Sequence, residues 1–459
     1  MRLIFSRQRA YFTSLELGFL RKAYASACWV DTDELDSVLR LISNEVVFPT
    51  STGDNLCPAV LLTEGRYLMN YIGIDIAKRK HDCAVINSEG EVLLSQFSFP
   101  NSGEGFVGLL SELSLLDVGC DDTVIGMEAT GHYWLALYAH LVAEDYTVHV
   151  INPIQTDAYR KISVRKTKND TIDSLAIAKF LRLGDYVPSQ ASSEEMVGLK
   201  NLTRYRMYLV STTSDCKRKA ISLLDQVFPE YEKIFSDMFG ETSKALLKEC
   251  QTPEDVLAIN TRKLANVLKK ASRGRFDTNK AKEIKGIAKK SFGVGYALDA
   301  FSLQLRQLIE QIEFLEKQVK ELEIEIAVLL KETDTFITSI PGIGATLGAV
   351  IVSEIGDVTR FSGPEKLVAF AGLDPSVYQS GEFSGTQGHL SKRGSPYLRY
   401  AIWSAAEKAR IYDPVLREHY ESKIAKGKHH NVAISAVARK LCNIICVILK
   451  EQRPYEIRQ

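Results

Sequence analysis

The chain has no excess of either charge, no paired-cysteine motif and no long uncharged apolar run. Its 57 Lys and Arg residues equal its 57 Asp and Glu residues, so any surface that binds nucleic acid must be local. Its eight cysteines are scattered without a C-x-x-C pair, which disfavours a zinc site and favours reduced thiols. No apolar run reaches about 18 residues, so we expect no membrane span and no membrane partner.

What is present is enough chain, 459 residues, for about three domains of an ordinary globular protein. Residues 1–68 begin with several basic residues and contain no strand-like pattern. We expect this segment to be an atypical, poorly ordered upstream extension, with Met69 as the functional start.

The pattern after Met69 is α/β. Tyr71–Ala77 alternates like a strand, with Ile72, Ile74 and Ile76 on one face, and two further strands follow as a meander of hairpins. A helix, the short apolar strand Val124–Met127, a second helix, another strand and a final helix come next. Three strands followed by alternating helices and strands is the ribonuclease-H-like order.

Four carboxylates stand at informative places in this order. Asp75 lies in the first strand, Glu128 follows a later strand, and Asp170 and Asp173 lie one helical turn apart where a helix begins. Carboxylates from separated segments suit Mg²⁺, which prefers hard oxygen ligands, and two such ions can promote displacement at a phosphodiester. The pattern therefore predicts a metal-dependent site that cuts polynucleotides.

Each acid also has a structural explanation. Asp170 could be a helix N-cap, Asp173 a first-turn acid favoured by the helix dipole, and Glu128 the cap of the next helix. Asp75 is the hardest to explain in this way, because an acid between two isoleucines in a strand is costly unless it is paired or binds metal.

Local positive charge surrounds these acids. The candidate phosphate contacts upstream of Asp170 are Arg160, Lys161, Arg165, Lys166 and Lys168, although such runs are usually a solvated face. In the second half, the turn Ile340–Gly344 is a helix-hairpin-helix signal, in which Gly342 and Gly344 would let backbone N–H groups approach a phosphate. A plain tight turn between packed helices explains the same residues.

A heptad seam occupies about 300–332 in a helical region of 191–334. Its members alternate three and four residues apart: Leu305, Leu308, Ile312, Leu315, Val319, Leu322, Ile326 and Leu329. This spacing predicts a coiled coil or a long helical hairpin, and a long helix packed on its own domain is the alternative. Residues 335–459 are expected to form a mainly helical C-terminal domain. Within it, Ser380 begins a Gly/Ser-rich loop, and spacing alone does not distinguish this serine from its neighbours.

Short motifs in a specific order give the chain a family resemblance from Met69 to its end. They are Tyr71–Lys78, Glu128–Gly131, Val150–Pro153, Lys166–Asp173, Ser339–Gly344, Phe370–Pro375, Tyr378–Gly381 and Ser391–Gly394. In these motifs the chain resembles the DEDD transposases of the insertion-sequence one-ten family, which are bridge-RNA-guided serine recombinases. Residues 1–68 depart from the family pattern, which does not need them.

The resemblance implies a RuvC-like DEDD domain over 69–190 in which Asp75, Glu128, Asp170 and Asp173 hold Mg²⁺ or Mn²⁺. It implies that Ser380, in the C-terminal transposase domain, attacks DNA and forms a covalent phosphoserine intermediate, and that Lys392 and Arg393 lie in a motif that contacts nucleic acid. The implied partners are donor and target DNA, a structured guide RNA and further copies of the chain. These copies would form a homo-oligomer, a dimer or tetramer, joined through the coiled coil. The implied location is the bacterial or archaeal cytoplasm, at the nucleoid.

Three other hypotheses stay open at this point. A metal-dependent, structure-specific endonuclease of the Holliday-junction type would use water as its nucleophile. A non-catalytic scaffold would bind nucleic acid without cutting it. A decayed element would retain the motifs while its N-terminal extension blocks assembly.

Overall fold

The computed structural model describes residues 69–457 except 130, 163–169, 185, 187–192, 377–378, 381–382 and 385–388. For residues 154, 160–162, 170–172, 379–380 and 383–384 only the backbone is described. The predicted extension, 1–68, lies outside the described residues.

The first part of the described chain is a five-stranded mixed sheet in the order β3-β2-β1-β4-β5. The strands are β1 (Asn70–Ile76), β2 (Lys80–Asn87), β3 (Val92–Pro100), β4 (Thr123–Glu128) and β5 (Thr147–Ile151). β1, β2 and β3 form antiparallel hairpins, whereas β4 and β5 run parallel to β1. The predicted meander and the order of the later strands are therefore confirmed.

Helices cover both faces of this sheet. The isoleucines of β1 pack in one core with α3 (Gly103–Leu115) and α4 (Trp134–Ala143). The opposite face, which carries Tyr71, packs against α6 (Asp170–Leu183). Alternate side chains of β1 therefore belong to different cores, because successive side chains of a strand point to opposite faces. Helix α5 (Pro153–Ile162) is an additional helix between the last predicted strand and the final predicted helix.

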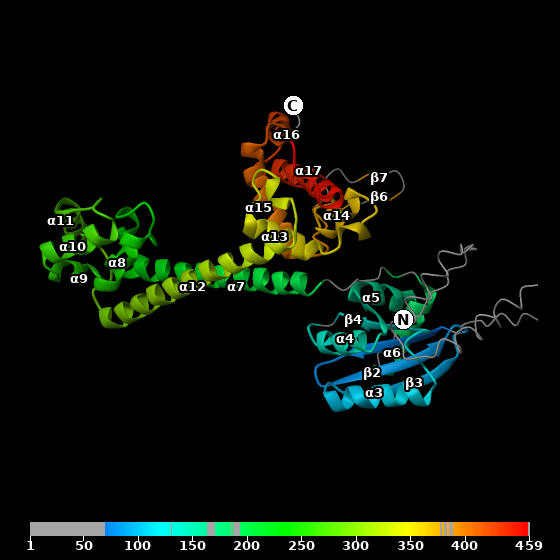
Figure 1. Ribbon diagram of the computed structural model, residues 1–459. Helices are drawn as coiled ribbons and strands as arrows, with labels where there is room; N and C mark the ends of the chain where they lie inside the picture. The colour runs from blue at the N-terminus through cyan, green and yellow to red at the C-terminus, as the bar shows by residue number, and fades with distance from the viewer. Residues whose placement is uncertain are drawn as a thin grey trace, which may run out of the picture. The chain divides into compact units, whose positions relative to one another are not determined.

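Two long helices dominate the next part, α7 (Glu194–Val227) and α12 (Leu298–Glu332), and Figure 1 shows them side by side. They are antiparallel, because the start of α7 shares a core with the end of α12, and the end of α7 shares one with the start of α12. Between them lie η1 (Pro229–Lys233), α8 (Glu241–Glu249), α9 (Pro253–Ala258), α10 (Thr261–Ala271) and α11 (Thr278–Ala288).

The heptad seam becomes one side of this helical hairpin. Buried positions at one end of α12 are Leu305, Ile309 and Ile312, and at the other end Ile326 and Leu330. Three of these five belong to the predicted seam, whereas Ile309 and Leu330 each lie one residue after a seam position, as fits a straight helix with 3.6 rather than 3.5 residues per turn. The long helix is confirmed, while its association with another protomer stays a prediction.

The C-terminal part is mainly helical, as predicted. Its elements are η2 (Ile337–Ser339), α13 (Ala345–Ile355), η3 (Val358–Arg360), α14 (Pro364–Phe370), the two-residue strands β6 (Gln379–Ser380) and β7 (Phe383–Ser384), α15 (Pro396–Tyr412), α16 (Pro414–Ala425) and α17 (His430–Glu451). Both Cys442 and Cys446 are buried as free thiols in α17. Burial raises the pKa of the Cys442 thiol to about 12, which keeps it protonated and inert.

Helix α17 is longer and more apolar than the sequence analysis allowed. Its 22 residues are long and apolar enough to cross a membrane, so the expectation that no run reaches this length was wrong. However, 61% of its most apolar window is buried inside the protein, where it packs against α14, α15 and α16. This burial is that of a core helix.

Candidate active site

Asp75 and Glu128 lie at the same edge of the sheet. β1 and β4 are parallel and in register as far as the pair Ile74 and Met127, and the two acids are the next residues along each strand. Parallel strands end on the same side, so the acids are neighbours at their carboxyl ends. We call this side of the sheet the acid edge.

Helix α6 brings Asp173 to the acid edge. A Cβ at Gly73 would lie 2.0 Å from the carbonyl oxygen of Ser174, so the backbones of β1 and α6 are in direct contact there. Farther along α6, Arg182 donates to the carbonyl of Ser88 at 3.4 Å, in the turn beside the start of β1. The helix therefore runs antiparallel to β1, and its first turn, with Asp173, lies toward Asp75.

Asp170 is the first residue of α6, one turn before Asp173. Its backbone is placed toward the acid edge by the same packing, while its side chain lies outside the described atoms. Strand register and helix packing thus place three of the four predicted acids toward the same edge of the sheet, and they place the backbone of the fourth there as well.

Glu128 is nearly buried, with 9% of its surface exposed. The hydroxyl of Thr156 in α5 donates to its carboxylate at 3.1 Å, and the same hydroxyl lies 3.0 Å from the carbonyl of Pro153. A hydroxyl has one hydrogen, so these two acceptors share it. Helix α5, which the sequence analysis missed, therefore orients one of the candidate ligands.

Asp82 is a further acid at this edge that the sequence analysis missed. It is the cross-strand partner of Asp75 on β2, and directly opposed residues of a hairpin share a face. Its carboxylate is buried and accepts from the hydroxyl of Ser98, from Gln96 at 3.1 Å and from the ammonium of Lys80 at 3.2 Å. Burial alone would raise the pKa of Asp82, but these hydrogen bonds and the charge of Lys80 outweigh it and lower the pKa. The hairpin register would have revealed this residue.

The acid edge therefore gathers negative charge that suits a divalent cation. Carboxylate oxygens are the donors that Mg²⁺ and Mn²⁺ prefer, and like charges at close quarters are stabilised by a cation between them. Within the described ranges, no three His, Cys, Asp or Glu residues already form a cluster that could hold a metal ion. The donor set therefore fits these metals in the type of its ligand atoms.

Ser380 lies in a small hairpin of the C-terminal part. β6 and β7 are antiparallel, with Ser380 opposite Phe383, and their side chains lie outside the described atoms. The base of this loop is firmly tied, because Pro375 and Leu390 form a bridge and the hydroxyl of Ser376 donates to the carbonyl of His389 at 2.8 Å. We call the segment 376–389 the serine loop.

Two of the predicted motifs pack together beneath the serine loop. Gly372 and Gly394 both have positive φ, and a Cβ at Gly394 would lie 1.9 Å from the carbonyl oxygen of Phe370. A Cβ at Gly372 would lie 2.2 Å from the carbonyl oxygen of Arg393. These glycines allow the two backbones to touch, so the motifs around 370–375 and 391–394 form one support.

The predicted nucleic-acid contacts have different outcomes. Lys392 and Arg393 are exposed beside the support of the serine loop. Arg160 and Lys161 belong to α5 without described side chains, and Arg165, Lys166 and Lys168 lie outside the described residues. None of these contacts is tested by the structure.

The turn with Gly342 and Gly344 has a packing role that the sequence did not reveal. Gly342 has φ +91°, and a Cβ there would lie 2.6 Å from the backbone nitrogen of Ala409 in α15. Gly344 is exposed, precedes α13 and has open space around its Cα. Gly342 therefore allows the close approach of a helix of the same protein. Of the two glycines in this turn, only Gly344 is open to a ligand.

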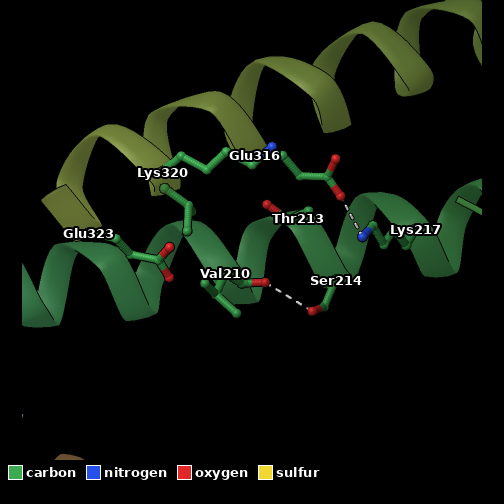
Figure 2. Close-up of a pocket in the computed structure, with 8 residues that line it drawn as sticks. Val210, Thr213, Ser214, Lys217, Glu316, Lys320 and Glu323 are labelled. Carbon is green, nitrogen blue, oxygen red and sulfur yellow. Dashed lines mark hydrogen bonds and ion pairs between the residues drawn. The ribbon is translucent and has the colours of Figure 1, made fainter. Parts of the chain in front are cut away.

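A cavity of about 340 Å³ lies between α7 and α12. Figure 2 shows the ammonium of Lys217 bound to Glu316 across it, at 2.7 Å. Glu323 pairs with Arg206, so both acids that line the cavity are neutralised by α7. The cavity is thus part of the helix–helix interface, and we assign it no chemistry.

Comparisons with known proteins agree with the motifs. Residues 72–229 match a family model described as transposase, and residues 334–421 match one described as transposase of the IS116/IS110/IS902 family. The IS116 44.8 kDa protein of Streptomyces clavuligerus is 24% identical, over 83% of this chain and 95% of its own length. The IS900 42 kDa protein of Mycobacterium paratuberculosis is 27% identical, over 84% and 96%.

A third relative has a different name. The pilin gene-inverting protein of Moraxella lacunata is 24% identical, over 84% of this chain and 98% of its own length. The two family models together span the sheet with its acid edge and the C-terminal part up to α16. The chain therefore belongs to the IS116/IS110/IS902 family of transposases, enzymes that act on DNA.

Proposed function

We propose that the protein cuts and rejoins DNA through a covalent phosphoserine intermediate at Ser380, assisted by a divalent metal at the acid edge. The observation that supports this proposal is that Asp75, Glu128 and Asp173 all lie toward one edge of the sheet, through strand register and the close contact of β1 with α6. Acids that served only as helix caps would have no reason to share one edge of a sheet.

Asp75, Glu128, Asp170 and Asp173 would hold the metal, Mg²⁺ or Mn²⁺. When bound, such an ion stabilises negative charge that develops on phosphate and leaving oxygens. Thr156 would keep the carboxylate of Glu128 oriented, since it donates to that carboxylate from α5. Asp82 would add negative charge from the partner strand of Asp75.

The serine step is a transesterification. The Ser380 oxygen forms a new ester bond to phosphorus while one bridging P–O bond of the DNA strand breaks. The serine proton leaves to a base, and the departing DNA oxygen takes up a proton. Attack by a DNA hydroxyl on the phosphoserine reverses these changes and rejoins a strand, so the bond energy is retained.

The remaining parts of the chain would serve assembly and recognition. We propose a catalytic domain over 69–190, a helical region over 191–334 that joins protomers, and a serine-bearing domain over 335–459. A structured guide RNA would pair with donor and target DNA, while the protein holds backbone and shape. The name of the Moraxella relative, a gene-inverting protein, fits recombination rather than simple cutting.

Trapping a protein–DNA adduct tests the proposal. The protein would be purified with its co-purifying RNA, incubated with DNA that carries the flanks of its own coding region, and denatured before electrophoresis. We expect an adduct from the unaltered protein and from the control variant Ser384→Ala, and none from Ser380→Ala. Sequencing of the co-purifying RNA should yield one discrete species.

Two outcomes would contradict parts of this scheme. If Ser380→Ala still cuts DNA at the unaltered rate, the serine is not the nucleophile, and the metal-dependent endonuclease becomes the better explanation. If cutting persists in Asp75→Asn with the metal dependence unchanged, the acid edge is not the metal site.

A further inference from the structure

A second cavity, of about 140 Å³, lies in the α/β part of the chain on the face covered by α3 and α4. Its wall includes His81, the loop Pro100–Gly103, and Phe106 and His140 from the two helices. One water needs only about 15 Å³, so the cavity has room for a tetrahedral oxyanion or several waters. We call it the His81 pocket.

The start of α3 faces this pocket with hydrogen-bond donors. Ser102 is the N-cap, and its hydroxyl accepts from the N–H of Gly105 at 3.2 Å. The N–H group of Gly103, a residue of the pocket wall, precedes the first intrahelical bonds, so it points out of the helix end. A Cβ at Gly103 would meet nothing within 4 Å, which shows open space there. Helix N-termini of this kind favour anions.

His81 supplies an independent sign of a missing ligand. It is 1% exposed, and its Nε2 is a buried polar atom without a hydrogen-bond partner in the structure. Its Nδ1 accepts from the backbone N–H of Ala77 at 3.4 Å, which assigns the proton of the neutral ring to Nε2. A buried N–H without an acceptor costs about 1–3 kcal/mol, so an acceptor from outside the protein would be stabilising.

The ring of His81 is held firmly. It packs edge-on against Phe99 with the centroids 5.4 Å apart. Burial lowers the pKa of His81, and the nearby side chain of Asn101 and the charge of Asp82 oppose that shift without reversing it. The Asn101 side chain is thus close enough to favour the charged ring, although Nε2 has no partner with hydrogen-bond geometry. The imidazole therefore acts as a neutral donor at physiological pH.

We propose that the His81 pocket binds a backbone phosphate of the DNA strand that crosses the acid edge. His81 is the cross-strand partner of Ile76 and so lies beside the end of β1, on the sheet face opposite Asp75. The inference rests on the proposed function, which brings DNA to the acid edge, and it adds a contact that involves neither Ser380 nor a metal.

The charges around the pocket agree with an anionic ligand. Lys78 and Arg79 are exposed in the turn before His81. Asn101 holds this turn in place: its side-chain amide donates to the carbonyl of Lys78, and its backbone N–H donates to the carbonyl of Arg79. The acid of the first turn of α3, Glu104, is exposed and is not part of the pocket wall.

Labelled histidine gives a direct readout of occupancy. The full-length protein would carry ¹³Cε1-histidine, and the His81 signal would be assigned by its loss in His81→Phe. Inorganic phosphate and a short single-stranded DNA would be titrated separately, without divalent metal. We expect DNA to shift the His81 signal, and phosphate to shift it in the same direction. A shift with phosphate alone would overturn the assignment to DNA, and no shift with either would overturn the pocket as a phosphate site.

Binding measurements with variants complete the test. His81→Phe keeps an aromatic ring but removes the donor, so DNA should bind about tenfold more weakly. His149→Phe, on β5 outside the pocket, is the matched control and should leave the affinity unchanged.

If His81→Phe does not fold, an exposed position replaces it. Asn101→Asp adds a negative charge at the pocket wall and should weaken DNA binding about tenfold, whereas Ser111→Asp adds the same charge to an exposed site farther along α3. Equal DNA affinity in these two variants would overturn the proposal. Because no metal is present, failure here would leave the cleavage test of Ser380 independent.

Discussion

Replacing Gly73 by alanine would test how the acid edge is assembled. The added Cβ would lie 2.0 Å from the carbonyl oxygen of Ser174 and 2.4 Å from the nitrogen of Ala178, both backbone atoms of α6. Real Cβ atoms do not approach other atoms within 3.0 Å, so β1 and α6 must separate by about 1 Å. Overpacking of this kind costs about 1–3 kcal/mol of unfolding free energy.

The same shift moves Asp173 away from Asp75. A loss of supporting geometry around metal ligands weakens metal binding by about 10–100-fold, and a displacement of 1 Å can lower a rate by about 100-fold. Denaturant unfolding would measure the loss of unfolding free energy. Electron paramagnetic resonance would measure the loss of Mn²⁺ binding, and a DNA-cutting assay the loss of rate. We expect all three to change together in Gly73→Ala.

Gly108→Ala is the matched control. Gly108 lies in α3, and its Cβ would meet only the ring edge of Phe97 at 4.0 Å. Alanine is favoured over glycine inside a helix, so this variant should gain about 0.5–1 kcal/mol and bind Mn²⁺ normally. If Gly73→Ala has the same unfolding free energy and the same Mn²⁺ affinity as the unaltered protein, the packing of α6 on β1 does not position the acids.

Three further predictions concern the helical parts. In the folded protein the pKa of Glu354 lies below its unfolded value of 4.5: burial opposes this shift, but hydrogen bonds from Arg204 and Ser395 and the charge of Lys200 outweigh burial. The stabilising effect of Glu354 is therefore present above pH 4.5 and is lost as pH falls through the lowered pKa. Glu354→Gln should therefore flatten the acid limb of a stability–pH curve, and an unchanged limb would refute this. Gly342→Ala should lower the unfolding free energy by about 1–3 kcal/mol, because φ is +91° and α15 is in contact, whereas Gly344→Ala should have little effect on denaturant unfolding. Glu316→Gln should lower the unfolding free energy by about 1–3 kcal/mol in thermal or denaturant unfolding. The reason is that Lys244, whose side chain is 5% exposed, donates to Glu316 at 2.8 Å. An unchanged unfolding free energy would mean that the other acceptor of Lys244 is sufficient.

Local pattern accounts for much of what could be predicted. Alternation in Tyr71–Ala77 and the turn residues after β2 indicated the first three strands, because period-two burial and turn chemistry are properties of short segments. The same holds for α12, whose apolar spacing marks a long helix over 300–332. Helix α5 was missed because Asn152-Pro153 signals both the end of a strand and the start of a helix, and the sequence does not decide between them.

Two findings depend on contacts between distant segments. Asp82 joins the acid edge only through its register with Asp75, and a slip of one residue would turn its carboxylate to the other face. The motifs that contain Gly372 and Gly394 are separate in the sequence, yet their backbones touch beneath the serine loop.

The sequence by itself determined the order of the five strands, the long helix over 300–332, the four candidate acids and the family motifs, since these lie in local spacing and residue type. Only the tertiary structure decided that Asp75, Glu128 and Asp173 lie toward one edge of the sheet, that Gly342 faces a helix, and that Nε2 of His81 is buried beside a helix N-terminus. The physical reason is that register, helix packing and the burial of a polar atom are set by pairs of segments far apart in the chain.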